Sequence, residues 1–416
     1  MKSKNSKRLF TTLLVLVLTA GVYFLGFFSF KWTRSDVEKE VLKILDAYDE
    51  HYYYKDGDVV DKIVDAIFDQ YSEYYTPSEY AELKRKTLGQ NTGIGLSFLS
   101  GSLVVYGVAV NSPCYNQGVK AGGTLLSATK GETTKFGNDA KELLQSLTQG
   151  ETVTISVDYS GEVQTFTITK SEYNDSYVTY QSSSGTYVFH EKQSSMQLEK
   201  CSNDVIGKSG VGYIKLSSFN GKGEGSYGTA SQLKTALLKF KEEGNKKLIL
   251  DLRNNGGGYM DVASKISGIL IQKHQTPQVL SVSEDRNGNR TSHYIGENFY
   301  DDYGFEKIVV LANINTASAS EMLIGAMLDY DDNNVVQVVI EGYENNGETI
   351  YKTFGKGIMQ TTYSYRDGSA IKVTTAKVFW PKSNVCIHGV GITENTSEKV
   401  VNSSDKNALV YALQII

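Results

Sequence analysis

The residues with the clearest chemical potential are two serines, Ser318 and Ser320, in the stretch NINTASASEMLIGAML at 313–328. Small residues here lead into an apolar helical pattern, so the serines lie at the expected start of a helix. Backbone N–H groups in a first helical turn are unpaired, and the helix dipole is positive there. Ser318 could therefore attack a carbonyl while the N–H of Ala319 stabilises the oxyanion. The alternative is a serine that only caps or packs the helix.

A serine nucleophile needs a group that takes its proton, and no histidine is placed to do so. None of the five lies in a local triad-like motif: His51, His190, His274, His293 and His388. A lysine can act instead if burial lowers its pKa, because desolvation disfavours the ammonium form. Lys356 lies between two glycines in YKTFGKGIMQ, and Gln360 could orient its amine. The alternative is an ordinary solvated lysine.

A second junction, DLRNNGGG at 251–258, follows another apolar run. Three consecutive glycines let the backbone turn sharply and approach a ligand closely. Their N–H groups could serve as oxyanion donors. The stretch lacks the Gly-Lys-Ser/Thr of a phosphate-binding loop, so a nucleotide is not an expected ligand. A plain strand–helix turn is the alternative.

These segments lie in a region of alternating strands and helices, residues 211–400. The apolar runs KKLILDL and KIVVLAN are continuous, which is typical of buried strands in a parallel sheet. We therefore expect an α/β core whose functional groups gather where strands end and helices begin. Residues 401–416 are predicted to form a closing helix with Asp405 as its cap.

The N-terminus predicts a membrane anchor. Four basic residues at 1–8 precede an uncharged apolar stretch at 9–30, which is long enough to cross a bilayer as a helix. The positive-inside rule makes 1–8 a cytoplasmic tail and places the catalytic part outside the cell membrane. We expect an uncleaved, single-pass signal-anchor; a cleaved signal peptide is the alternative.

Three further regions differ in their residue patterns. Residues 35–88 read as helices. Residues 89–172 read as short strands with glycine turns, including a hairpin about Ser160-Gly161, and predict a self-contained β-rich domain. Residues 173–210 are polar and irregular, and we interpret them as a linker with a surface insertion.

The composition excludes some classes of function. A net charge of −5 gives no basic surface for nucleic acid. The acidic stretch DYDDNN at 329–334 does not match a calcium loop, and we expect neither a metal nor a cofactor. Cys114, Cys201 and Cys386 do not make a disulfide framework, although one pair could form outside the cell.

Five stretches occur in the order found in the carboxyl-terminal processing proteases, and the chain resembles this family over nearly all of its length after residue 30. They are GYIKLSSF, LILDLRNNGGG, VVLANINTASASEML, TFGKGIMQ and GSAIKVTTAKVFWP. The resemblance implies an α/β multidomain protein with a crotonase/Clp-like serine peptidase core and a Ser-Lys dyad. It also implies a PDZ domain at 89–172 and dimerisation through 35–88.

The family pattern implies a role for individual residues of the core. Ser318, not Ser320, is the implied nucleophile. Lys356 is the implied general base, and Gln360 holds it. The N–H groups of Gly258 and Ala319 form the implied oxyanion hole.

The resemblance also implies how a substrate is recognised. In GIGLSF, the residues that receive the substrate's C-terminal carboxylate are Gly93, Ile94, Gly95 and Leu96. The peptide would add a strand to the sheet edge beside them. The expected function is a serine endopeptidase that cleaves extracytoplasmic proteins from or near their C-termini.

Several departures keep alternatives open. The stretch between Ser318 and Lys356 is longer than in the family, around YENNGETIYKT, and could displace Lys356 or act as a lid. Gly256 replaces a proline that is usual in the family. The alternatives are a catalytically inactive membrane-tethered PDZ scaffold and a ligand-binding homologue.

Overall fold

The computed structural model describes residues 38, 40–45, 59–99, 101–221, 227–275 and 277–416. It consists of two compact units, residues 1–63 and 64–416. In the first unit residues 40–45 are helical, and Lys43 pairs with Glu40 at 2.9 Å.

The predicted cytoplasmic tail and signal-anchor, residues 1–30, lie outside the described residues. Among the helices that are described, none is both long and apolar enough to cross a membrane.

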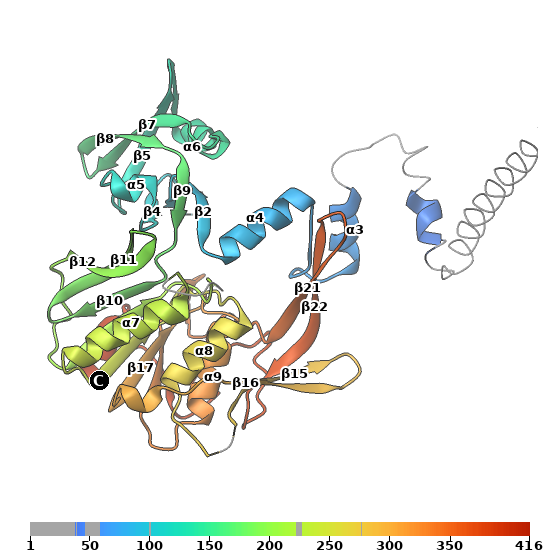
Figure 1. Cartoon of the computed structure of the whole chain (residues 1–416), viewed down its shortest axis with the longest axis vertical. Helices are drawn as coiled ribbons and strands as arrows, with labels where there is room; N and C mark the ends of the chain where they lie inside the picture. The colour runs from blue at the N-terminus through green and yellow to red at the C-terminus, as the bar shows by residue number, and fades with distance from the viewer. Residues whose placement is uncertain (1–37, 39, 46–58, 100, 222–226, 276) are drawn as a thin grey trace, which may run out of the picture. The chain divides into compact units, whose positions relative to one another are not determined.

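The second unit is built on an eight-stranded sheet (Figure 1). From edge to edge its strands are β12 (Ser195–Ser202), β11 (Gly185–Lys192), β10 (Val178–Ser182), β13 (Val211–Leu216), β14 (Lys247–Asp251), β17 (Lys307–Ala312), β18 (Val336–Ile340) and β23 (Val400–Asn402). The five strands from β13 to β23 are parallel, and β10, β11 and β12 are antiparallel.

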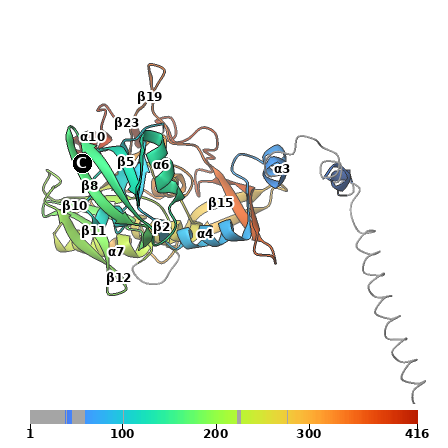
Figure 2. The same cartoon turned by 90° about the horizontal axis from the view of Figure 1, so that it is seen from above.

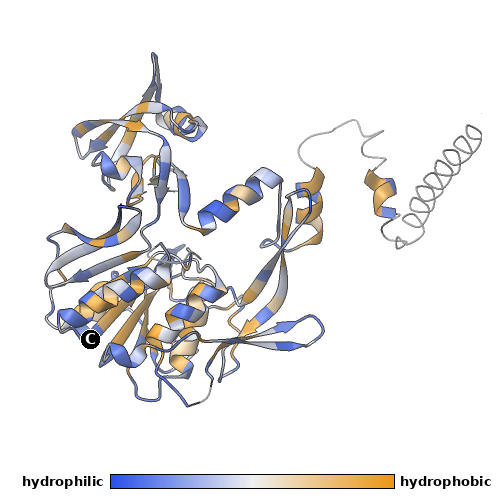
Figure 3. Cartoon of the chain, viewed as in Figure 1, coloured by the Kyte–Doolittle hydropathy of each residue, from blue (hydrophilic) through white to orange (hydrophobic). Residues whose placement is uncertain are grey.

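Helices pack on both faces of this sheet. They are α7 (Thr229–Glu242), α8 (Met260–Leu270) and α9 (Ala319–Asp329) on one face and α10 (Ala408–Ile415) on the other. Successive strand residues point to opposite faces, so Leu248 and Leu250 pack under the first three helices while Ile249 packs under α10. Burial on both faces explains the continuous apolar runs, and Figure 3 shows the apolar residues along these strands. Each fully buried leucine contributes about 1.5–3 kcal/mol.

The structure corrects the prediction for residues 173–210. Instead of a linker with a surface insertion, this region supplies β10, β11 and β12 of the main sheet. Tyr180 and Phe189 are fully buried on the side of α7, whereas the opposite side of these strands carries polar residues. One-sided burial at a sheet edge gives the polar composition that suggested an irregular segment.

The closing helix α10 also differs in detail. Its N-cap is Asn407, whose side chain accepts a hydrogen bond from the N–H of Leu409 at 3.0 Å. Asp405, the predicted cap, accepts instead from the N–H of Asn407 at 2.9 Å.

A second sheet stands beside the main one and borders the candidate site. Its strands are β1 (Glu73–Tyr75), β22 (Ala370–Phe379), β15 (Val279–Asp285) and β16 (Arg290–Tyr294), with β21 (Ile358–Ser364) also paired to β22. The helices before and after β1 are α3 (Val59–Ile67) and α4 (Pro77–Thr87). Residues 35–88 were expected to be helical, but Glu73–Tyr75 pair with β22 as a strand.

Residues 90–174 form a β-rich unit with a core of its own around Leu125, Ile155 and Ile168. Its elements are β2 (Gln90–Gly93), β3 (Leu96–Phe98), β4 (Val105–Val108), α5 (Pro113–Asn116), β5 (Thr124–Lys130), β6 (Thr133–Phe136), α6 (Gly137–Ser146), β7 (Thr152–Tyr159), β8 (Glu162–Thr169) and β9 (Ser171–Asn174). The β7–β8 hairpin turns at Ser160 and Gly161, which both have positive φ, as a two-residue hairpin turn requires.

The extra residues before Lys356 form a small hairpin, β19 (Tyr343–Asn345) and β20 (Glu348–Ile350). Figure 2 shows it projecting from the surface of the core. Its residues do not line the cavity described below.

Candidate active site

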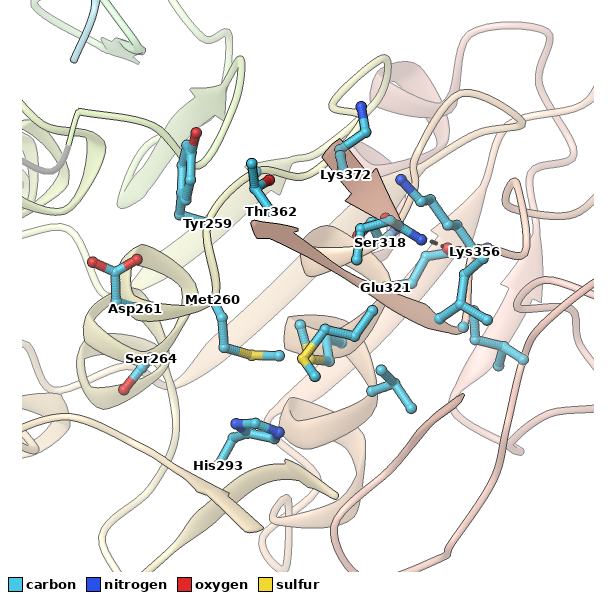
Figure 4. A pocket seen from close by; sticks show the side chains of 18 of the residues that line it. Tyr259, Met260, Asp261, Ser264, His293, Ser318, Glu321, Lys356, Thr362 and Lys372 are labelled. Carbon is cyan, nitrogen blue, oxygen red and sulfur yellow. Dashed lines mark hydrogen bonds between the residues drawn. The ribbon is translucent and has the colours of Figure 1, made fainter. Parts of the chain in front are cut away.

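Ser318 lies in a strained turn between β17 and α9. Its φ of 57° and ψ of −118° form a conformation that costs a residue with a side chain about 1–3 kcal/mol. The turn is held by Thr316, whose hydroxyl donates to the carbonyl of Leu252 and accepts from the N–H of Asn313, both at 2.9 Å. This conformation places Ser318 at the wall of a cavity of about 880 Å³ (Figure 4).

Ser320 has a different environment, although it is only two residues away. It is 0% exposed, and its hydroxyl donates to the carbonyl of Asn255 at 3.0 Å. Ser320 therefore fastens α9 to the glycine turn after β14, and it does not line the cavity.

The glycine turn packs directly against the turn that carries Ser318. A Cβ on Gly257 would lie 2.8 Å from the nitrogen of Ala319 and 3.0 Å from the Cβ of Ser318, so the two turns are in direct contact. Within the described chain, neither the N–H of Gly258 nor that of Ala319 has a hydrogen-bond partner. Two unpaired donors at a helix N-terminus are suited to stabilising an oxyanion.

Lys356 lies on the segment that enters β21 and lines the same cavity. The segment is fixed by hydrogen bonds on both sides: Phe354 N–H donates to Thr316 O at 3.0 Å, and Gly389 N–H donates to Gly355 O at 2.8 Å. The β19–β20 hairpin therefore does not displace Lys356 from the site.

The Lys356 amine is half-buried, and its electrostatic surroundings are mixed. Burial lowers the pKa of Lys356, and the charge of nearby Lys372 lowers it further. The carboxylates of Asp69 and Glu321 raise it without reversing the direction. Ser318 and Lys356 face one cavity, but no hydrogen bond joins their side chains in this structure. Catalytic hydrogen bonds are often long before substrate binds.

Gln360, which by the resemblance holds Lys356, has a different hydrogen-bond partner in this structure. It lies at a bulge in β21, and its side-chain amide donates to the hydroxyl of Thr374 on β22 at 3.1 Å. No hydrogen bond connects Gln360 with Lys356 in the described part of the chain. Gln360 also lines the cavity.

The residue that joins the two halves of the site is Glu321, which was not recognised from the sequence. Its carboxylate is 0% exposed and accepts the backbone N–H groups of Ser318 and Lys356, both at 2.9 Å. It also accepts the N–H of Gly355 at 2.8 Å and the hydroxyl of Thr353 at 2.5 Å. One side chain therefore fixes both the serine turn and the lysine segment.

Burial raises the pKa of the Glu321 carboxyl, and its four hydrogen bonds act in the opposite direction. Each carboxylate oxygen receives two donors, which leaves no position for a proton, so the group carries its negative charge here. The spacing Ser-x-x-Glu was the available signal, because a glutamate at the third helical position commonly bonds back to the residue before the helix.

A buried ion pair holds the ends of the central strands below the site. Arg253 donates to both carboxylate oxygens of Asp251 and also to Glu341. Asp251 is 1% exposed, and Tyr213 donates to it at 2.7 Å. This network fixes the start of the DLRNNGGG turn and was not recognised from the sequence.

One part of the cavity wall is apolar. Seven residues there carry aliphatic, aromatic or thioether side chains: Met260, Met322, Ile358, Met359, Val378, Trp380 and Ile387. Figure 4 shows Met260 between the Ser318 side of the cavity and His293 on β16. A cavity of this size can take side chains of an extended peptide.

The predicted carboxylate-binding residues lie in the β-rich unit and do not line this cavity. Gly93 ends β2, Ile94 and Gly95 form the turn, and Leu96 begins β3. Within the described chain, the N–H groups of Ile94 and Gly95 have no hydrogen-bond partner. Gly95 has a φ of +84°, and a Cβ there would lie 2.1 Å from Ser112, so only glycine fits.

The described residues contain no group of His, Cys, Asp and Glu that could hold a metal ion. Cys114, Cys201 and Cys386 are all free thiols in this structure. The acidic stretch at 329–334 is partly buried. Asp331 in it is buried and pairs with Lys399 at 2.8 Å.

Comparison with known proteins finds a peptidase family and similar proteins. Residues 210–397 match the model of peptidase family S41. The chain is 28% identical to a "Probable CtpA-like serine protease" of Staphylococcus saprophyticus, over 92% of this chain and 71% of that protein. It is 29% identical to a protein of the same description from Staphylococcus aureus, over 87% of this chain and 64% of that protein.

A solved structure, the photosystem II D1 C-terminal processing protease, matches with 24% identity and a TM-score of 0.45, covering 82% of this chain and 80% of that chain. On the family match and the curated relatives, the chain is a serine-type peptidase whose residues 210–397 are similar to peptidase family S41.

Proposed function

We propose that the protein is an endopeptidase that cleaves extracytoplasmic proteins from or near their C-termini, with Ser318 as nucleophile and Lys356 as general base. The observation that carries the proposal is the bridge through Glu321. It fixes the backbone of Ser318 and that of Lys356 at one cavity, next to two unpaired N–H groups.

In the proposed mechanism, the neutral amine of Lys356 takes the proton of the Ser318 hydroxyl as the oxygen attacks a peptide carbonyl. The N–H groups of Gly258 and Ala319 donate to the oxyanion. The Lys356 ammonium then donates its proton to the leaving amine, which leaves an ester on Ser318. A water molecule, deprotonated by Lys356, attacks the ester and restores the serine.

Substrate selection would use the β-rich unit as a PDZ domain. A C-terminal carboxylate would accept the N–H groups of Ile94 and Gly95, with Gly93 and Leu96 completing the turn. The bound peptide would extend along β3, whose strand pairing in the structure is with β4 alone. An anchor at 9–30 and dimerisation through 35–88 would complete the assembly at the membrane.

The test is proteolysis of an unfolded protein with an apolar C-terminus by the full-length chain. We expect Ser318→Ala and Lys356→Ala to abolish cleavage. We expect Ser320→Ala to keep it, because that hydroxyl is buried away from the cavity. Cleavage that survives Ser318→Ala would overturn the assignment of the nucleophile. Binding of C-terminal peptides without cleavage by the parent would favour an inactive scaffold.

A further inference from the structure

A second lysine, Lys372, lies in the cavity with Lys356 and has no part in the mechanism above. It lies on β22 directly opposite Glu73 of β1. Its amine donates to the Glu73 carboxylate at 2.8 Å and to the Tyr75 hydroxyl at 2.7 Å. Figure 4 shows the amines of Lys356 and Lys372 on the same side of the cavity, above Ser318.

We propose that Lys372 is a positioning residue of the active site: its fixed positive charge favours the neutral form of the neighbouring Lys356 amine, which is the form that can act as the base. The proposal rests on the proposed function, in which Lys356 takes the serine proton.

Two ammonium groups in one half-buried cavity repel each other, so one of them tends to lose its proton. The partners of each amine decide which one. Burial alone would lower the pKa of Lys372, but its hydrogen bonds to Glu73 and Tyr75 and the charge of Glu73 raise it. The Lys356 amine has neither a hydrogen bond nor an ion pair within the described chain, and its pKa is lowered. Neighbouring groups whose pKa values are pushed apart in this way commonly divide acid and base roles.

Three other groups face the Lys356 amine and favour its charged form, which opposes the effect of Lys372. The ring of Tyr71 lies 5.1 Å from the amine and favours its charged form. Asp69 is exposed and already accepts from Ser72 and from the N–H of Tyr71, so solvent screens its charge. The carboxylate of Glu321 is committed to four donors on its own side. These groups reduce the effect of burial and of Lys372 but do not reverse it.

The first test compares the pH dependence of kcat/KM in the parent, Lys372→Met and Lys372→Arg. Methionine keeps the apolar stem and removes the charge, whereas arginine keeps the charge. We expect the pH at which kcat/KM rises to be about one unit higher in Lys372→Met than in the parent. Cleavage by this variant should be about tenfold slower than by the parent below that pH and similar above it. In Lys372→Arg, kcat/KM should rise at the same pH as in the parent.

The matched control is Lys377→Met, on the same strand but exposed and outside the cavity, which should leave the profile unchanged. Glu73→Gln should move the rise in kcat/KM in the same direction as Lys372→Met but by a smaller amount. This variant weakens the contact that holds the Lys372 amine in place, but Lys372 keeps its charge. An unmoved rise in Lys372→Met, or a loss of rate that is equal at every pH, would overturn the proposal.

A second readout does not depend on catalysis. In a Ser318→Ala background, the rate at which an amine-acylating reagent modifies Lys356 can be followed against pH by mass spectrometry. We expect Lys372→Met to shift this titration upward by the same amount as the rise in kcat/KM. No shift would refute the role of Lys372 even if the protein is a protease. A shift in a protein that cleaves no substrate would leave this electrostatic coupling standing and refute the proposed function.

Discussion

The core cavity and the turn at 93–96 use the same backbone arrangement in different surroundings. In each, two N–H groups have no partner within the described chain. In each, a glycine packs against a serine so closely that a Cβ has no room: Gly257 against Ser318, and Gly95 against Ser112. Under the proposed function, each turn would receive a negatively charged oxygen.

The difference lies in the ionisable groups nearby. Around Ser318 the cavity holds the amines of Lys356 and Lys372 and the buried charge of Glu321. Behind the turn at 93–96 lies Cys114, whose thiol pKa burial raises to about 12, so it stays neutral. Under the proposed function, the same backbone arrangement would bind a charge that the reaction creates in one place and a permanent carboxylate in the other.

Glu321→Gln is expected to have the largest effect, and it acts on the core cavity. The amide N–H groups of glutamine would face backbone N–H groups, which are also donors and cannot bond to them. The serine turn and the lysine segment should therefore separate. We expect a loss of kcat of about 10²-fold for each group that is displaced. Thermal unfolding should show a folded protein, and Glu348→Gln, on the exposed hairpin, is the control. Unchanged kcat would mean that the Glu321 bridge has no part in catalysis.

Gly257→Ala should affect the oxyanion site alone. The added Cβ would push against Ala319 N and Ser318, and we expect about 10²-fold slower labelling of Ser318 by a fluorophosphonate. Gly256→Ala is a close control, because a Cβ there meets nothing within 4 Å. Equal effects of the two substitutions would show that the loss is not specific to the oxyanion site.

Gly95→Ala is the corresponding change in the β-rich unit. We expect binding of a peptide with a free apolar C-terminus to weaken about 10- to 100-fold, because hydrogen bonds to a charged group are lost. Cleavage of a short internal peptide should be kept. Fluorescence polarisation with free and amidated peptides measures the effect, and Gly107→Ala is the control. If the parent binds both peptides equally, this turn does not bind a carboxylate.

A smaller effect is expected in the pH dependence of stability. The pKa of Lys356 is lowered in the folded state, so the unfolded chain binds more protons between that lowered value and the usual value near ~10.4. The free energy of unfolding of the parent should therefore rise with pH across this window. Urea titrations of the parent and Lys356→Met should show a steeper rise in the parent; identical slopes would contradict a lowered pKa.

The smallest effect is expected from shortening the β19–β20 hairpin. Replacement of residues 344–349 by Asn-Gly should change kcat/KM by less than about twofold. The reason is that Phe354 and Gly355, which lie between the hairpin and Lys356 in the chain, are already fixed by hydrogen bonds to the core. A large loss would show that the hairpin acts on the cavity as a lid.

The sequence predicted those elements and turns whose burial or chemistry requires particular residue types at neighbouring positions. Continuous apolar runs predicted β14 and β17, and the small-residue and glycine runs marked the turns that follow them. Strands with one polar face leave no such pattern, and so β10–β12 at one end of the sheet are not predicted from the sequence. The bond of Gln360 to Thr374 depends on a bulge, which spacing cannot reveal. The role of Glu321 depends on a segment more than 30 residues downstream, which only the folded chain places opposite it.

The pairing of β1 with β22 has a consequence for biosynthesis. Glu73 and Lys372 are separated by 299 positions, and β22 lies near the end of the chain. Contacts of such long sequence separation form late, after most of the loop between them has been synthesised. A nascent chain can therefore complete its own cavity only after β22 has been synthesised. A protease built in this way is inert toward its neighbours until that point.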